Sequence, residues 1–339
     1  MTSLPIVTRL LAIGVAGLVC FGICSLNVQQ ALAQPPAVKN AVKQNASDSS
    51  TPAKHLLVIS SNRLRNSKPL QAKSRMRVHL FGQQVVAHGN YWQAGQGTGS
   101  ARWEYAVPKA GSGTAGNTTS VKPDSANLFL MQICHRGFFY RLQTDGKEPK
   151  LDVTDLRQLS KTDSQFLFAG QKAWMATGGV SGLLELLATN FIFSDASRSK
   201  VGNNEVWKMN GSWDENRLRR LLNGQVNHSL IQEEIKWLEL PKQIPHSCEV
   251  LLAADDYFPG FPYRVTFFQR QSHDGVVQKK PIVSIEFYEL QTDVKLDEEI
   301  FDVKFDGIQL EDLTDSFVQR IEALQRSRRS AQQHQPVSR

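Results

Sequence analysis

The sequence predicts an α+β fold organised around an antiparallel sheet. Short runs in which apolar and polar residues alternate recur along the chain, about ten in all, as half-buried strands do. The first five follow one another with loops between them, which antiparallel strands permit. Helical patterns are grouped near the middle of the chain instead of alternating with the strands. This grouping favours an α+β plan over an α/β one.

The first 33 residues have the three parts of a secretory signal peptide. Arg9 is the only charged residue before the apolar run of residues 10–26, and Ala31-Leu32-Ala33 supplies small residues at both positions that signal peptidase reads. We therefore expect cleavage after Ala33 and a periplasmic or secreted mature chain. The alternative is a membrane anchor, which needs about 20 apolar residues. The run is shorter than that and ends in a polar segment.

The positions of the four cysteines bear on lipid anchoring and on disulfide bonding. Cys20 and Cys24 lie in the apolar run, but each follows a branched apolar residue, so the cleavage motif of a lipoprotein is absent and no lipid anchor is expected. Cys134 and Cys248 remain in the mature chain. An oxidising compartment permits a disulfide between them. Each also lies in an apolar strand-like run, so two separate buried thiols are the other alternative.

Composition divides the mature chain into three parts. Residues 34–53 are rich in Ala, Gln, Ser, Asn and Pro and predict a disordered spacer, residues 54–325 predict a single domain, and residues 326–339 predict a basic disordered tail. The formal net charge of the whole chain is +7. The basic clusters at residues 63–77 and 326–339 indicate a solvated surface or a weak attraction to anionic lipid or acidic polymer. We expect no nucleic-acid partner outside the cytoplasm and no integral membrane segment after cleavage.

The predicted elements follow from the period of the apolar residues. Helices are expected where apolar residues recur every three or four positions, at 54–65, 152–159, 183–191, 214–222, 231–240 and 313–324. Strands are expected at 76–81, 85–93, 102–107, 127–134, 137–143, 203–211, 247–253, 263–270, 282–290 and 301–305. The helix at 183–191 is apolar nearly all round, which predicts that it is buried or that it covers something.

Four phrases carry a resemblance to a known family. They are Val86–Gln93, Glu205–Trp213, Val250–Pro259 and Leu296–Val303, set in an order of helix, meander, central helices and further strands. This order resembles the periplasmic lipoprotein-carrier fold, the LolA/LolB-like family, in a divergent form such as planctomycete-type secreted proteins carry. The resemblance implies a curved antiparallel sheet that forms an incomplete β-barrel, with helices covering the open side. It also implies an apolar concave face that accepts acyl chains.

No catalytic, metal or cofactor signature is present in the sequence. The eight histidines include no two with metal-ligand spacing on one element, and the zinc-protease, nucleophile-elbow, Walker and dinucleotide motifs are absent. The glycine-rich stretch at 95–99 lies between two strands, where no helix N-terminus supplies converging amides, so it predicts a flexible turn. Asp255-Asp256 beside Tyr257–Gly260 predicts an ordinary turn. We therefore expect no enzyme, no metal and no cofactor.

The aromatic residues on the strands are the strongest functional signal. They fill either an ordinary core or a concave cavity that a lipid tail can enter, where burial of a methylene gains about 0.8 kcal/mol. The segment 183–191 would then be a movable cover, with Gly178, Gly179 and Gly182 giving backbone freedom. The candidate ligand-binding residues are Trp92, Trp103, Tyr105, Phe129, Phe139, Trp207, Leu184 and Leu187.

Together these features predict an exported, non-enzymatic protein that binds a lipid or a lipoprotein acyl chain. The alternative is an envelope sensor or a scaffold that uses the same fold to contact envelope proteins, and a third is an unrecognised hydrolase. An open sheet interior favours the carrier, and a filled interior favours the scaffold.

Overall fold

A computed structural model of the chain describes residues 52–80, 83–108, 126–144, 148–159, 178–222, 234–241, 244–255, 257–273, 276–303, 307–319 and 322. The predicted signal peptide, its cleavage site, the spacer up to residue 51 and the basic tail lie outside these ranges. Within them, no helix combines the length and the apolar character required to cross a membrane. What we expect of the two ends of the chain stays a prediction.

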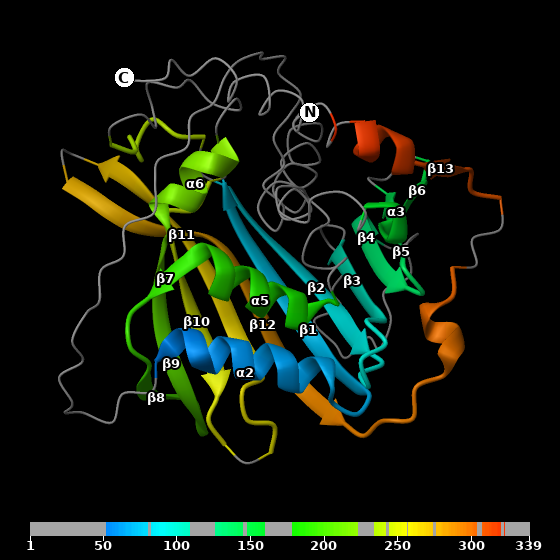
Figure 1. The fold of residues 1–339 in the computed structure, drawn as a ribbon, viewed down its shortest axis with the longest axis horizontal. Helices are drawn as coiled ribbons and strands as arrows, with labels where there is room; N and C mark the ends of the chain where they lie inside the picture. Colours follow the sequence, from blue (N-terminus) through cyan, green and yellow to red (C-terminus); the bar gives the residue numbers. More distant parts are fainter. Residues whose placement is uncertain are drawn as a thin grey trace, which may run out of the picture.

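The described residues form one large sheet of 13 strands (Figure 1). The first half of the chain gives β1 (Leu70–Leu80), β2 (Gln83–Gln93), β3 (Ala101–Pro108), β4 (Ala126–His135), β5 (Phe138–Thr144) and β6 (Lys150–Asp155). The second half gives β7 (Phe191–Phe193), β8 (Ser197–Val201), β9 (Asn204–Trp213), β10 (Ser247–Ala253), β11 (Pro262–His273), β12 (Val276–Thr292) and β13 (Leu310–Asp312). The order across the sheet is β13-β6-β5-β4-β3-β2-β1-β12-β11-β10-β9-β7, and β8 pairs with β9.

The topology confirms the predicted fold class. Strands β1 to β6 form an antiparallel meander, and β12 returns to pair with β1 and join the two halves. The exception to antiparallel pairing is the short strand β13, which runs parallel to β6. The end strands β13 and β7 do not pair, so the sheet curves without closing and forms an incomplete barrel.

Two helices cover one face of this sheet. They are α2 (Ala53–Arg65) and α5 (Val180–Asn190), which lie next to each other across the middle strands in Figure 1. We call the face beneath them the inner face and the opposite one the outer face. The shorter helices are α3 (Leu156–Leu159), α6 (Glu215–Leu222) and the 3₁₀ helix η4 (Glu298–Phe301). Asp214 caps α6, because its Oδ1 accepts a hydrogen bond from Arg217 N–H at 3.1 Å.

Strand alternation divides the apolar residues into two layers. The larger layer joins the inner face to α2 and α5 and includes Leu57, Met76 and Leu187. The smaller layer lies on the outer face of β3 to β6, where Met131 and Leu142 pack against Phe301 of η4. A single strand serves both layers, since alternate residues point to opposite faces.

Three local predictions are wrong. Of the helix expected at 152–159, residues 152–155 belong to strand β6 instead, because they pair with β5, while Leu156–Leu159 form α3. Residues 234–240 form turns instead of a helix, and residues 231–233 lie outside the described ranges. Residues 298–301 form η4, where a strand was expected to begin at 301.

The two cysteines are separate buried thiols and not a disulfide. Cys134 lies on β4 and Cys248 on β10, and five strands separate these two in the order of the sheet. The structure therefore agrees with the alternative of two separate buried thiols.

Candidate apolar site under two helices

Five of the eight predicted ligand-binding residues meet beneath the two helices. Trp103 and Tyr105 on β3, Phe139 on β5, and Leu184 and Leu187 on α5 belong to one cluster, each at most 4% exposed. Tyr105 also carries a fully buried hydroxyl. The structure thus brings these five residues together in one buried cluster, and their binding of a ligand beneath a movable α5 stays a prediction. With α5 in this position, which we call the closed arrangement, side chains fill this part of the inner face.

The other three predicted residues lie elsewhere. Trp92 and Phe129 point to the outer face, because their neighbours Tyr91 and Leu128 occupy the inner one. Trp207 is half-buried at the margin of the inner layer, with the Arg198 guanidinium 4.0 Å above its ring. These three residues do not line the space under α5.

Tyr91 is the central residue that was not among the predicted site residues. Its ring is fully buried and makes edge contacts with Trp103 and Phe287, at centroid distances of 5.7 and 5.8 Å. The sequence held a signal for this residue, because Tyr91 follows Gly89 by two positions and strand residues two apart lie on the same face. Gly89 lies against the backbone of Glu104, where an added Cβ would be 1.7 Å from the carbonyl oxygen.

The Tyr91 hydroxyl holds the start of α5. It accepts a hydrogen bond from Val180 N–H at 2.9 Å and donates one to Gln93 Oε1 at 2.7 Å. The Gln93 amide in turn donates to the Leu64 carbonyl of α2 at 2.7 Å. The helix has no side-chain cap of its own, because its N-cap residue is Gly179. A side chain of the sheet thus supplies the capping acceptor that the helix start requires.

Gly179 makes this approach possible. Its φ of +69° is open to glycine but costly for other residues, and an added Cβ would lie 2.3 Å from the Tyr91 hydroxyl. The two helices are also joined to each other. Ser61 Oγ donates to the Ser181 carbonyl at 2.9 Å, and Arg65 pairs with Glu185 at 2.5 Å on the half-exposed side.

The apolar layer is uncharged at neutral pH. Burial raises the pKa of both Tyr91 and Tyr105 well above the ordinary value for tyrosine. Burial likewise raises the pKa of the Cys134 thiol to about 12 and that of Cys248 further still. Low thiol reactivity is the expected consequence, since the nucleophile is the thiolate.

The inner face changes character at β4. Cross-strand pairs place Gln132, Arg141 and Asp152 in a row beside Trp103, across β4, β5 and β6. Arg141 and Asp152 form an ion pair at 2.6 Å, and Gln132 and Asp152 are buried. This polar row therefore interrupts the apolar inner face on β4 to β6, with Leu130 on one side of it and Phe139 on the other.

The described residues include no group of three or more His, Cys, Asp or Glu that could hold a metal ion. The inner face itself presents apolar surface, which a polar row interrupts on β4 to β6 and a hydrogen-bonded helix covers. This arrangement suits binding by exclusion of water.

Comparison with known proteins finds similarity only among solved structures. No protein-family model matches the chain, and no curated protein matches it. One similar structure is a putative outer membrane lipoprotein-sorting protein domain from Vibrio parahaemolyticus, with 8% identity over 74% of this chain and 95% of that one and a TM-score of 0.32.

Two further similar structures come from other bacteria. The Pseudomonas aeruginosa MucA/MucB complex has 11% identity, covers 74% of this chain and 61% of that one, and gives a TM-score of 0.37. A LolA superfamily protein from Nitrosomonas europaea has 7% identity, covers 75% of this chain and 99% of that one, and gives a TM-score of 0.28. The family that the sequence resembles is thus among the structures to which this chain is similar.

Proposed function

We propose that this protein is an exported, non-enzymatic protein that binds a long apolar chain, from a lipid or a lipoprotein, on the inner face beneath α5. The observation that carries the proposal is the way α5 is held. Its contacts with the sheet are almost all apolar, and its start is hydrogen-bonded to one sheet hydroxyl, that of Tyr91. Displacing the helix therefore breaks mainly apolar contacts with the sheet, together with the hydrogen bond from Val180 to Tyr91 and the one from Ser61 to Ser181.

The energetics set a minimum length for the ligand. Moving α5 from the sheet exposes the apolar side chains of Val180, Leu183, Leu184 and Leu187, which costs about 8 kcal/mol at about 2 kcal/mol for each side chain. An acyl chain regains about 0.8 kcal/mol for each buried methylene, so about ten methylenes offset the loss of these apolar contacts. Chains of biological lipids exceed that length, whereas short fatty acids do not reach it.

Lipid extraction from protein purified from the cell envelope tests this proposal directly. Mass spectrometry of the extract should show a co-purified long-chain lipid, and Leu184→Ala with Leu187→Ala should change the amount bound. The idea of α5 as a cover fails if these substitutions lower stability but leave lipid binding unchanged. The same sample gives the mature N-terminus, expected at Gln34 if the signal peptide is cleaved after Ala33.

The filled state of the inner face favours a second candidate function. Trp103, Leu184 and Leu187 leave little exposed surface in the closed arrangement, as a sensor or scaffold that binds envelope proteins through its exterior would. For that function the extract contains no stoichiometric lipid, and cross-linking in the envelope captures a protein partner instead.

A further inference from the structure

The paired ends of β11 and β12 form a two-stranded arm that projects from the sheet. The described strands on either side stop short of it, because β10 pairs with β11 only as far as Phe268 and β1 pairs with β12 only as far as Val283. From Gln269, which lies opposite Lys280, the two strands pair with each other alone among the described strands. Figure 1 shows this end of the hairpin extending past the other strands near α6. We call residues 269–280 the arm.

Two basic side chains of the arm lie directly opposite each other. Arg270 pairs with Lys279 across the hairpin, and residues in such a pair point to the same face. Both side chains are exposed, and neither forms an ion pair within the described part of the chain. The Lys279 Nζ lies 4.1 Å from the centre of the Phe268 ring. Like charges directly opposite each other destabilise a hairpin, so an anion that contacts both would stabilise this one.

The positive charge reaches the base of the arm. The pKa of His246 is lowered to about 4, mainly by burial and also by the positive charges of Arg270 and Lys279. Lys280 adds a third basic residue to the arm, against one acidic residue, Asp274, which lies outside the described ranges. The arm is therefore cationic overall, which favours an anionic partner.

Two exposed valines follow the turn of the arm. Val276 is 59% exposed and Val277 is 54% exposed, and as neighbours on a strand they point to opposite faces. At a membrane surface, apolar side chains enter the boundary between head groups and acyl chains, while lysine and arginine are attracted to anionic lipids. A soluble acidic partner accounts for the charges alone, whereas an anionic bilayer accounts for both the charges and the valines.

We propose that the arm docks on the surface of an anionic phospholipid bilayer. Arg270, Lys279 and Lys280 contact the lipid phosphates, and Val276 and Val277 enter the interface. The arm is distinct from the inner face beneath α5, so this contact does not depend on the ligand proposed there.

Co-sedimentation of the mature chain with lipid vesicles tests the proposal. One set of vesicles contains phosphatidylglycerol and phosphatidylcholine in equal amounts, and the other contains phosphatidylcholine alone. The chain should bind the anionic vesicles more tightly than the neutral ones. Added salt should release it from the anionic vesicles, because salt screens the attraction between exposed charges.

The variant Arg270→Glu separates the arm from the other basic parts of the chain. Its carboxylate lies opposite Lys279 and replaces a like-charge pair by an ion pair, so the midpoint of urea denaturation should stay the same or rise. Binding to anionic vesicles should nevertheless fall about 25-fold, at about fivefold for each unit of charge near the surface. The control Lys200→Glu makes the same change in net charge at an exposed position on β8, and it should change binding by less than about twofold.

A dye at the tip of the arm reports on entry into the interface. Burial raises the pKa of the thiols of Cys134 and Cys248, so a thiol-reactive dye should label Val277→Cys selectively. Emission of a polarity-sensitive dye at position 277 should shift to the blue on anionic vesicles. The same dye on Val201→Cys, an exposed position on β8, should show no shift. Replacing both Val276 and Val277 by Ser should weaken binding, because less apolar surface leaves water.

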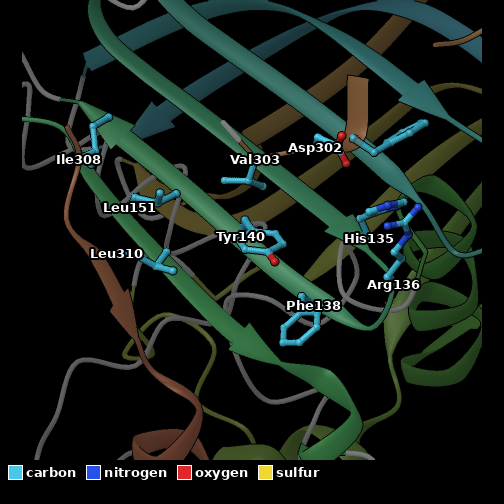
Figure 2. Close-up of a pocket in the computed structure, with 10 residues that line it drawn as sticks. His135, Arg136, Phe138, Tyr140, Leu151, Asp302, Val303, Ile308 and Leu310 are labelled. Carbon is cyan, nitrogen blue, oxygen red and sulfur yellow. The ribbon is translucent and has the colours of Figure 1, made fainter. Parts of the chain in front are cut away.

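A pocket on the outer face provides a control for lipid bound elsewhere. Its volume is about 460 Å³ and it lies on β5 and β6, on the other side of β1 from the arm in the order of the sheet. Figure 2 shows that Arg136 and Asp302 both line it together with Phe138 and Tyr140, so its charges oppose each other. The variant Ile308→Trp adds bulk to this pocket and should leave binding to anionic vesicles unchanged.

Several outcomes would overturn the proposal. They are equal binding of the two kinds of vesicle, wild-type affinity in Arg270→Glu, an unshifted dye at position 277, and loss of vesicle binding in Ile308→Trp. Binding of soluble poly-glutamate in preference to anionic vesicles would also overturn it and would assign the arm to an acidic protein partner. The substitutions Leu184→Ala and Leu187→Ala should leave vesicle binding unchanged, so failure of the inner-face proposal and failure of this one are distinguishable.

Discussion

Removal of one hydroxyl from Tyr91 should loosen α5 while leaving the core packed. The substitution Tyr91→Phe keeps the ring and its edge contacts with Trp103 and Phe287. It deletes the acceptor for Val180 N–H and the donor to Gln93 Oε1. No cavity the size of a side chain is created, so the loss reports on the hydrogen bonds alone.

The expected loss of stability follows from the two polar groups that Tyr91→Phe leaves without a partner. A buried hydrogen bond contributes about 1 kcal/mol net, and a buried donor or acceptor left without a partner costs about 1–3 kcal/mol. Val180 N–H and Gln93 Oε1 are both in buried surroundings and both lose a partner. We therefore expect Tyr91→Phe to lower the free energy of unfolding by about 2–4 kcal/mol.

Urea denaturation of the mature chain measures this change, and amide hydrogen exchange locates it. Exchange should accelerate at residues 180–187 more than in β1 or β12. Tyr257→Phe is the matched control, because the Tyr257 side chain is exposed and its hydroxyl lies 3.4 Å from the Leu290 carbonyl. That control should change stability by less than about 0.5 kcal/mol.

A Tyr91→Phe protein as stable as the Tyr257→Phe control would refute the assignment of Tyr91 as the cap of α5. Faster exchange spread evenly over the sheet would also refute it, since a cap acts on the helix start. If lipid uptake on the inner face requires α5 to move, the same variant should take up lipid faster.

Three further predictions concern other parts of the fold. Gly179→Ala should lower the free energy of unfolding by at least about 3 kcal/mol, because the added Cβ clashes with the Tyr91 hydroxyl in addition to the cost of a positive φ. Gly99→Ala is its control. Gly99 has the same φ of +69° but nothing within 4 Å of the added Cβ, so this variant should cost only about 1 kcal/mol. Burial lowers the pKa of His246 to about 4, below the 6.5 of the unfolded chain, so the free energy of unfolding should fall as the pH drops from 6.5 to 4. Urea denaturation at the two pH values should show the wild type losing about 1–2 kcal/mol more than His246→Gln, since the ring is partly exposed to solvent. Because Cys134 and Cys248 are not bridged, a reductant should leave the melting temperature unchanged.

The sequence predicted the positions of the strands well where apolar and polar residues alternate regularly. It predicted less well which side chains point to which face of the sheet. On β3, Trp103 and Tyr105 alternate with polar or small residues, so the inner side was evident. On β2 and β4, large apolar residues occur on both faces, and Trp92 and Phe129 could not be assigned a side from the pattern alone. The second apolar layer on the outer face, which η4 and the following segment complete, explains that pattern.

Two other features depend on contacts distant in sequence. Val153, Leu156 and Leu159 have helical spacing, yet residues 150–155 pair with β5 because a neighbouring strand offers them hydrogen bonds. The cap from Tyr91 to Val180 joins residues 89 positions apart, which no local pattern can indicate. His135 and Phe301 likewise meet only after β4 and η4 are brought together.

The polar row on β4 to β6 indicates which way an acyl chain would lie on the proposed inner site. The Arg141–Asp152 ion pair is largely buried, and an acyl chain laid across it would shield both charges from water without replacing their partners, which is unfavourable. The apolar residues beneath α5 instead continue from Trp103 over β1 and β12 toward Val250 and Val265. A bound chain should therefore run across β3, β1 and β12, under the helix that covers them, with any polar end toward β4. The sheet itself separates this path from the outer face, because Phe139 of β5 points inward and Tyr140 points outward.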